Sequence, residues 1–399
     1  MDLRTRYAKA WKRKEPTGSL GSYMPEDVAI IGGSAAGLLT AYLLAQRGLQ
    51  VRLFEASDSV APPRRTLIAT NYLSGLIGPL CEGIAINKIR QYELFADGRS
   101  TKISLRRPDL IIERSKLIHS LAVLAEESGA QILTGRRFLS METNGRQLNF
   151  ILSRNDNRWP VEESADIIVG ADGALSKVAQ SAGWPKQSTE SVFQAVVELP
   201  KDMNSDTTRV WFAPENTSYF YWLIPHSPTQ GVLGVIGTEE RKARGDLQGF
   251  LARNALVPIE FQTASVPRYT YRVPFHRKMK GCHVYLVGDA AGHVKASTVG
   301  GLVTGFRGAI GVAEAILNGG SSRQFKALRL ELDLHYLIRK GLNCFTLADY
   351  VRLLDLLTPS VKHSLSLFNR DDTGRLLCHV FFRQPRLLLL GLRSLLTGQ

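Results

Sequence analysis

A glycine-rich turn near the beginning of the chain limits what this sequence can fold into more than any other feature. The turn Gly32-Gly33-Ser34-Ala35-Ala36-Gly37 follows an apolar, β-branched run at 28–31 and leads into residues 35–47, whose helical spacing stops at Gly48. A second buried strand is expected at 51–54. Strand, glycine turn, helix and strand predict a βαβ unit that binds a dinucleotide, because the backbone N–H groups at a helix N-terminus can receive a pyrophosphate.

Each position of the turn has an expected role in such a site. Gly32 allows the tight turn and Gly37 lets the helix pack closely on the strand, while the backbone at Ser34 and Ala36 faces the phosphates. Ser34 stands where a second glycine is usual, so the backbone is more crowded there. Glu55 ends the second strand, where a carboxylate can accept hydrogen bonds from a ribose diol.

Composition and charge exclude several classes of protein. With 44% hydrophobic and 22% charged residues, the chain has the composition of a folded globular protein rather than a disordered or collagen-like one. Its four cysteines form neither a CxxC pair nor any metal-ligand spacing, and we find neither a signal peptide nor an apolar run of about eighteen residues. These observations predict a cytoplasmic protein without a metal site. The net charge of +14 indicates an acidic partner such as nucleic acid, anionic lipid or a phosphorylated substrate.

The remaining segments extend an α/β pattern and interrupt it once. Further buried strands or amphipathic helices are expected at 117–127, near 132, at 166–169, at 284–287 and at 303–317. Between 192 and 237 the segments are β-rich, separated by turns and without helical periodicity, which predicts an antiparallel sheet. From about Phe325 the chain is helical and rich in leucine.

Two later strands each end in an acid beside glycine. Asp172 is followed by Gly173, and Asp289 follows Gly288. Together with the first turn, they resemble the three fingerprints of the FAD-dependent hydroxylase/reductase superfamily. The resemblance implies FAD as the cofactor, with Asp289 on its ribityl chain and Asp172 as the acid of the middle motif. It also implies contacts to FAD from Arg114, Gly300, Gly301 and Leu302.

The later motifs narrow the resemblance to the geranylgeranyl reductase family. The stretch from Gly288 to Gly301 is similar to that family's GDAAG…KPTTGGG motif, with Ala296 and Val299 replacing a proline and a glycine. The segment Phe220-Tyr-Trp222-Leu-Ile-Pro is similar to its YxWxFP motif. The family resemblance implies that Phe220 and Trp222 line an isoprenoid tunnel. It implies hydride transfer from reduced FAD to a C=C bond of a prenyl chain on a lipid, quinone, pigment precursor or diphosphate.

This reading gives a complete domain prediction. The expected fold class is α/β, with a Rossmann-type FAD-binding domain, an inserted antiparallel β-sheet substrate domain and a C-terminal helical region. We assign residues 1–22 to a basic N-terminal arm, 23–75, 106–183 and 276–320 to the FAD-binding domain, 76–105 and 184–275 to the substrate domain, and 321–399 to the helical region.

The chain departs from the family at one place near the expected flavin. The family often has a Cys-Gly-Glu-Gly segment there, whereas this chain has Arg64 and Arg65, and Cys81 comes too late in the sequence. Arg64 and Arg65 are therefore expected to contact FAD. His293 is the histidine expected near the flavin, and its ordinary pKa suits proton transfer, so it is the candidate catalytic residue.

Several alternatives remain open at this stage. The segment around Trp222 is one substitution from the WxWxIP motif of flavin-dependent halogenases, and a flavin-dependent monooxygenase would have the same three FAD motifs. The electron donor, NAD(P)H or a ferredoxin, cannot be read from the sequence. No motif supports nucleic acid as a partner. Arginines interrupt the leucine-rich C-terminus at 375, 383, 386 and 393, a composition typical of a helix on an anionic membrane, so peripheral membrane association is a hypothesis.

Overall fold

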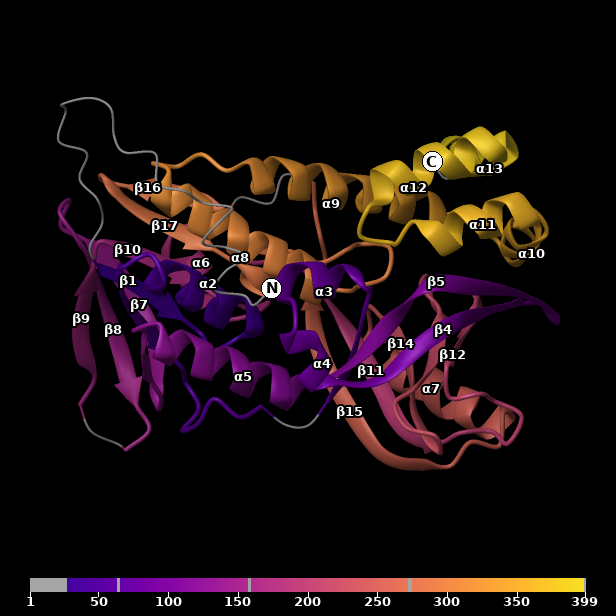
Figure 1. Ribbon diagram of the computed structural model, residues 1–399, viewed down its shortest axis with the longest axis horizontal. Coiled ribbons are helices and arrows are strands. Elements are labelled where there is room, and N and C mark those ends of the chain that lie inside the picture. The colour runs from indigo at the N-terminus through magenta and orange to yellow at the C-terminus, as the bar shows by residue number, and fades with distance from the viewer. Residues whose placement is uncertain (1–26, 63–64, 157–158, 272–274, 398–399) are drawn as a thin grey trace.

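Two β-sheets, each covered by helices, make up the framework of the protein (Figure 1). The computed structural model describes residues 27–62, 65–156, 159–271 and 275–397. The predicted N-terminal arm and Arg64 therefore lie outside the described residues. No helix in the described part of the chain is long and apolar enough to cross a bilayer.

The first sheet contains the predicted βαβ unit at its centre. Its strand order is β16-β17-β10-β1-β2-β6. All neighbouring pairs are parallel except β16 with β17. The strands are β1 (Asp27–Ile31), β2 (Gln50–Phe54), β6 (Gln131–Leu133), β10 (Ile167–Gly170), β16 (His276–Met279) and β17 (Cys282–Leu286). The strands predicted at 28–31, 51–54, near 132, at 166–169 and at 284–287 are confirmed within a residue or two.

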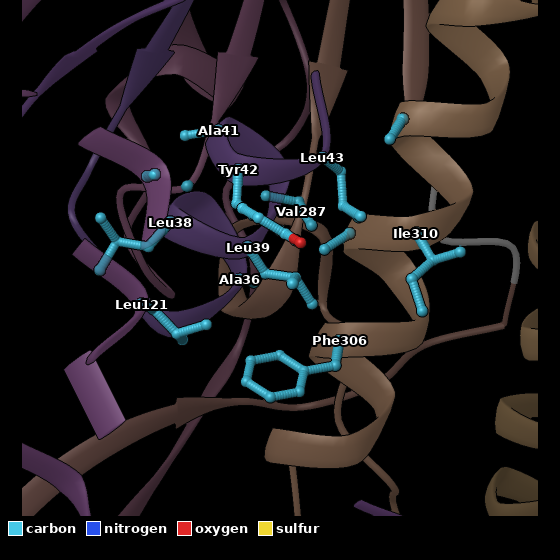
Figure 2. Close-up of a cluster of buried hydrophobic side chains, with 14 of the residues drawn as sticks. Ala36, Leu38, Leu39, Ala41, Tyr42, Leu43, Leu121, Val287, Phe306 and Ile310 are labelled. Carbon is cyan, nitrogen blue, oxygen red and sulfur yellow. The ribbon is translucent and has the colours of Figure 1, made fainter. Parts of the chain in front are cut away.

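Both faces of this sheet are buried, which explains the continuous apolar runs of its strands. Val28 and Ile30 point to the face covered by helices α2 (Ala35–Ala45), α5 (Arg114–Glu127) and α8 (Leu302–Leu317). Figure 2 shows this core, in which residues of α2 meet Leu121 of α5 and Phe306 and Ile310 of α8.

The opposite face of the first sheet is covered by elements that the sequence patterns did not reveal. Ala29 and Ile31 point toward a small antiparallel sheet of β7 (Arg136–Thr143), β8 (Leu148–Arg154) and β9 (Val161–Ala165), joined by the short helix α6 (Lys177–Ser181).

The second sheet is larger and almost entirely antiparallel. Its order is β15-β11-β14-β13-β12-β4-β5-β3, and the single parallel pair is β12 with β4. The strands are β3 (Thr66–Ala69), β4 (Ala85–Ala96), β5 (Arg99–Glu113), β11 (Thr189–Glu198), β12 (Thr207–Trp211), β13 (Tyr221–Pro225), β14 (Gln230–Gly237) and β15 (Pro258–Pro267). The predicted antiparallel sheet is therefore confirmed. β3 and the end of β5, which the sequence assigns to the FAD-binding domain, pair within this second sheet.

The two faces of the second sheet differ in what they contact. Tyr221 and Leu223 of β13 pack against helix α7 (Glu240–Arg253) on one face. Phe220 and Trp222 alternate with them and line a cavity on the other face. The period of two along a strand thus separates residues of the core from residues of the cavity.

The C-terminal region is helical, as predicted. It comprises α9 (Arg323–Leu342), α10 (Leu347–Asp355), α11 (Pro359–Leu367), α12 (Thr373–Arg383) and α13 (Pro385–Thr397). α9 packs on α8, whereas α10 and α11 lie against the β4–β5 hairpin, so this region bridges the two sheets (Figure 1).

Candidate functional site

A single cavity of about 1460 Å³ extends from the glycine turn after β1 to the apolar face of the second sheet. Sequence-predicted residues along its wall are Gly32, Ser34, Ala36, Glu55, Arg65, Arg114, Asp172, Phe220, Trp222, Asp289, Gly300, Gly301 and Leu302. Gly37, Cys81 and His293 do not line the cavity. The fold therefore brings the dinucleotide turn and the aromatic segment to one site.

Close backbone packing requires glycine at both ends of the first turn. Gly32 has a φ of +110°, and a Cβ atom there would lie 2.4 Å from the carbonyl oxygen of Ala171. A Cβ atom on Gly37 would lie 2.4 Å from the carbonyl oxygen of Gly32. Gly37 thus shapes the turn without lining the cavity, because it lets α2 pack closely against β1.

The rest of the turn presents polar groups to the cavity. The hydroxyl oxygen of Ser34 accepts a hydrogen bond from the backbone N–H of Gly37 at 3.2 Å, so Ser34 caps α2. The carboxylate of Glu55 accepts hydrogen bonds from the backbone N–H groups of Gly33 at 2.7 Å and Ser57 at 2.8 Å. Glu55 is thereby held beside the turn, in the position expected for binding a ribose.

Two arginines and an acid meet across the middle of the cavity. The backbone N–H of Arg114, at the start of α5, donates to the carbonyl oxygen of Arg65 at 2.9 Å. Burial lowers the pKa of Arg65 and nearby Arg114 lowers it further, while Asp289 acts in the opposite direction. Burial raises the pKa of Asp289, and both arginines counteract that effect. The Nε atom of Arg65 is buried and makes no hydrogen bond within the described residues.

The carboxylate of Asp172, the acid of the middle motif, is hydrogen-bonded to residues that follow it closely in the sequence. Its carboxylate accepts hydrogen bonds from the hydroxyl of Ser176 at 2.6 Å and from the backbone N–H groups of Lys177 at 2.7 Å and Val178 at 3.1 Å. It therefore satisfies the N-terminus of α6 while one side of the residue borders the cavity.

The structure does not favour His293 as a proton donor. Its Nδ1 atom accepts a hydrogen bond from the backbone N–H of Gly288 at 3.2 Å, and its ring packs on Gly308, where a Cβ atom would lie 2.1 Å from Nδ1. Burial lowers the pKa of His293 to about 3, so the ring is neutral at physiological pH. These contacts hold the turn after β17, and a catalytic role for His293 stays a prediction.

Cys81 lies in the hydrophobic core and not at the cavity. It is buried in the core around α4 (Leu80–Ile84), and burial raises the pKa of its thiol to about 11. A neutral thiol outside the cavity cannot replace the cysteine that the related family often places near the flavin.

An aromatic wall forms the far part of the cavity. The rings of Phe220 and Trp222 lie edge to face with centroids 6.1 Å apart. The indole of Trp222 rests on Gly234 of the neighbouring strand, where a Cβ atom would lie 2.2 Å from the ring. Trp222 is therefore supported from behind by bare backbone.

The wall of the cavity also carries a polar cluster that the sequence did not reveal. The hydroxyl of Tyr92 donates to the carboxylate of Asp109 at 2.6 Å. Arg370, from the segment between α11 and α12, forms an ion pair with the same carboxylate and lies 4.9 Å from the centroid of the Tyr92 ring. All three residues line the cavity. Arg370 is 261 positions from Asp109 in the sequence, and no local pattern connects it to the other two.

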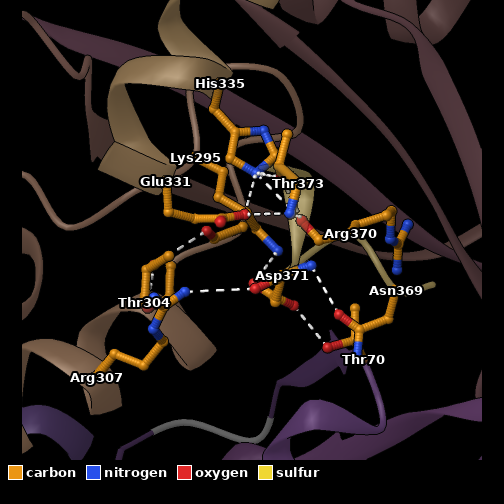
Figure 3. Close-up of polar contacts among 12 residues, drawn as sticks. Thr70, Lys295, Thr304, Arg307, Glu331, His335, Asn369, Arg370, Asp371 and Thr373 are labelled. Atoms are coloured by element: carbon orange, nitrogen blue, oxygen red, sulfur yellow. Dashed lines mark hydrogen bonds and ion pairs between the residues drawn. The ribbon is translucent and has the colours of Figure 1, made fainter. Parts of the chain in front are cut away.

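A second buried cluster attaches the C-terminal region to the cofactor side of the cavity (Figure 3). The ammonium group of Lys295 pairs with the carboxylate of Asp371 at 2.8 Å, and the hydroxyl of Thr70 donates to the other oxygen of that carboxylate at 2.6 Å. Burial alone would raise the pKa of Asp371, but Lys295 and Thr70 outweigh it and hold that pKa below its ordinary value. The backbone N–H of Lys295 also donates to the carbonyl oxygen of Gly300 at 3.2 Å, so the pair fixes the Gly300–Gly301 turn.

These features define a dinucleotide-binding protein, and family comparisons identify the dinucleotide. A family model described as an FAD binding domain matches residues 101–318, and one described as an NAD(P)-binding Rossmann-like domain matches residues 30–62. The first match covers more than half of the chain. The chain therefore belongs to the FAD-binding domain family and is an FAD-dependent oxidoreductase.

Curated relatives confirm the resemblance to geranylgeranyl reductases. The digeranylgeranylglycerophospholipid reductase of Methanococcus vannielii is 24% identical over 290 residues, which cover 69% of this chain and 73% of that protein. The chloroplastic geranylgeranyl diphosphate reductase of Arabidopsis thaliana is 27% identical over 365 residues, which cover 83% of this chain and 73% of that protein.

Solved structures share the fold. A geranylgeranyl bacteriochlorophyll reductase-like protein from Thermoplasma acidophilum has a TM-score of 0.73 at 18% identity, covering 91% of this chain and 97% of that chain. The flavin-dependent halogenase CmlS has a TM-score of 0.65 at 15% identity, covering 92% of this chain and 72% of that chain. Reductases and halogenases thus have a common framework, and the fold alone does not separate them.

The residues of the cavity fit FAD. Gly32, Gly33 and Ser34 present backbone to the cavity at the N-terminus of α2, where a pyrophosphate would lie, and Glu55 stands beside that position. The buried Nε of Arg65 lacks a partner that a bound ligand could supply. Gly300 and Gly301, at the N-terminus of α8, leave room for a planar ring.

The Lys295–Asp371 pair gives a testable expectation for stability. We expect Asp371→Asn to lower the free energy of unfolding by about 3–5 kcal/mol, because it leaves the buried ammonium of Lys295 without its counter-ion. Since the pKa of Asp371 is lowered in the folded state, its contribution is present at neutral pH and lost as the pH falls through that lowered pKa. Urea unfolding at several pH values measures both effects.

The adjacent Asp372 provides the matched control. It pairs with the exposed Arg375 at 3.5 Å, so Asp372→Asn should change the free energy of unfolding by about 0.5 kcal/mol or less. Equal losses for the two variants would contradict the importance given to the buried pair.

Proposed function

We propose that this protein reduces C=C bonds in the prenyl chain of a lipid or diphosphate substrate, with reduced FAD as the hydride donor. The observation that carries the proposal is the single cavity that joins the cofactor turns to an apolar aromatic wall. An extended hydrocarbon chain suits such a wall, because its burial is favourable and needs no polar partner. The names of the curated relatives, which specify prenylated lipids and diphosphates, also support this substrate class.

The chemistry sets two requirements for the protein. Bound and reduced, FAD supplies a hydride to one alkene carbon, a proton adds to the other, and the product has gained two hydrogens when FAD is oxidised again. The chain must therefore hold the alkene beside Gly300 and Gly301 in a dry environment and keep a proton nearby. Phe220 and Trp222 are suited to the first task.

Tyr92 is our candidate for the proton source. Tyr92 lines the cavity, and its hydroxyl donates to Asp109 at 2.6 Å, with Arg370 beside the same carboxylate. Burial raises the pKa of Tyr92 well above its ordinary value. The hydroxyl therefore stays protonated until it transfers its proton to a strongly basic carbon. The positive charge of Arg370 lies close enough to stabilise the phenolate that would form.

An anaerobic single-turnover experiment tests the reaction. The holoprotein is reduced with dithionite and mixed with geranylgeranyl diphosphate or with a geranylgeranylated phospholipid. We expect oxidation of the flavin together with products that are heavier by two hydrogens for each bond reduced. A flavin that stays reduced until oxygen is admitted, with an oxygen or a halogen appearing in the products, would replace the proposal with a monooxygenase or a halogenase.

The Tyr92→Phe variant tests the proton source. It should retain FAD and lower the rate of alkene reduction by about 10²-fold or more, because general acid catalysis is lost. Tyr219→Phe is the matched control, since Tyr219 is also buried and lies 3.4 Å from the carboxylate of Glu190 but does not line the cavity. Unchanged rates in Tyr92→Phe would exclude Tyr92 as the proton donor.

We also propose that the C-terminal patch contacts an anionic membrane surface. This patch comprises the exposed side chains Phe382, Leu388, Leu389 and Leu392 together with Arg383, Arg386 and Arg393. The side chain of Phe382 is 90% exposed. Apolar side chains can enter the interface of a bilayer while the arginines meet anionic headgroups, which is suited to an enzyme that acts on a lipid.

Vesicle sedimentation tests the C-terminal patch. We expect binding to phosphatidylglycerol vesicles that weakens with added salt, and little binding to phosphatidylcholine vesicles. The double variant Phe382→Ser/Leu389→Ser should reduce this binding severalfold. Val257→Ser is the control, because Val257 is 73% exposed and precedes β15 in the other part of the molecule. Equal binding by wild type and the double variant would refute the proposed surface.

A further inference from the structure

Val299 has a backbone conformation that valine rarely adopts. Its φ is +55°, in the left-handed region that glycine favours and β-branched residues avoid. Three other non-glycine residues in the described part of the chain have positive φ, namely Asp97, Ala255 and Lys280, and all are exposed and unbranched at Cβ. Val299 alone among these four lines the cavity.

The surrounding contacts hold Val299 in this conformation. Its backbone N–H donates to the carbonyl oxygen of Lys295 at 2.8 Å, and the backbone N–H of Lys295 donates to the carbonyl oxygen of Gly300 at 3.2 Å. Lys295 is itself anchored by Asp371. Strained residues persist where neighbouring structure determines them, and they gather at functional sites.

The side chain of Val299 lies where the cofactor side of the cavity meets the substrate side. It directly precedes Gly300 and Gly301. Like Phe220 and Trp222, it packs against a buried apolar cluster of Val192, Tyr219 and Ile236. Trp222, which packs on the same cluster, cannot move toward its neighbouring strand, because its indole already rests on the backbone of Gly234. Val299 therefore lines the cavity between the turn at Gly300 and the cluster that carries the aromatic wall.

We propose that Val299 is a specificity-determining residue that limits the width of the alkene reaching the cofactor side of the cavity. A glycine at this position would adopt the same backbone conformation without strain. The conformation is strained here only because valine carries a side chain. A linear prenyl chain passes the constriction, and a chain that carries a ring at the same position is excluded. The nature of the alkene rests on the proposed function, whereas the strained conformation of Val299 and its place on the cavity wall rest on the geometry alone.

Two variants separate side-chain volume from backbone strain. Val299→Ala removes two methyl groups and keeps a side chain at positive φ, whereas Val299→Gly removes both the side chain and the strain. Ala255→Gly is the control, because it relieves a positive φ at an exposed position outside the cavity. Each holoprotein is tested with geranylgeranyl diphosphate and with an analogue of equal carbon number that carries a cyclohexenyl ring.

The primary measurement is binding, followed as the change in absorption of oxidised FAD when either compound is added. We expect Val299→Ala and Val299→Gly to improve binding of the ring analogue relative to the linear chain by about tenfold or more, as removal of methyl groups from a pocket commonly does. Ala255→Gly should leave that ratio unchanged. In single turnovers, the preference for reduction should shift in the same direction.

The outcomes distinguish this inference from the proposed function. An unchanged binding ratio in Val299→Ala overturns the inference, even if Val299→Gly fails to fold. If the wild type binds the linear chain but does not reduce it, the proposed function fails, while the binding ratios still decide the role of Val299. A binding ratio that shifts equally in Ala255→Gly would also overturn the inference, because strain relief rather than width would explain it.

Discussion

The buried ion pair between Lys295 and Asp371 is the contact on which the arrangement of the cavity depends. It joins the loop that precedes α8 to the segment between α11 and α12, and Thr70 adds the end of β3 to the same carboxylate. Such a pair is costly to desolvate and is tolerated only when its geometry is well satisfied. Here it holds together three parts of the chain that line the cavity, and it brings Arg370 toward Asp109 and Tyr92.

The common cavity explains how one framework can support several flavin reactions. The cofactor end is built from backbone, with Gly32, Gly37 and Gly300 at close approaches, and it leaves little freedom for variation. The other end is built from side chains on one face of the second sheet. Alternation along β13 gives Tyr221 to the core and Trp222 to the cavity, so residues of the wall can change without loss of the core.

The sequence predicts the parts of this protein that depend on local chemistry. The turn at Gly32–Gly37, the strands of the first sheet and the aromatic segment around Trp222 are short patterns with a direct physical reason, and the structure contains them as expected. The cluster of Tyr92, Asp109 and Arg370 could not be predicted, because Asp109 and Arg370 are 261 positions apart. His293 illustrates a related limit, because sequence proximity to the Gly288–Asp289 motif does not tell which way a side chain points.

The contact between Thr70 and Asp371 spans 301 positions, so its two halves leave the ribosome at very different times. The glycine turn and the first βαβ unit can form early in synthesis, since their contacts are local. The segment that carries Arg370 and Asp371 arrives only when nearly the whole chain has been made. A nascent chain would therefore have its dinucleotide motif long before it had a closed cavity, and firm retention of the cofactor would belong to the finished protein.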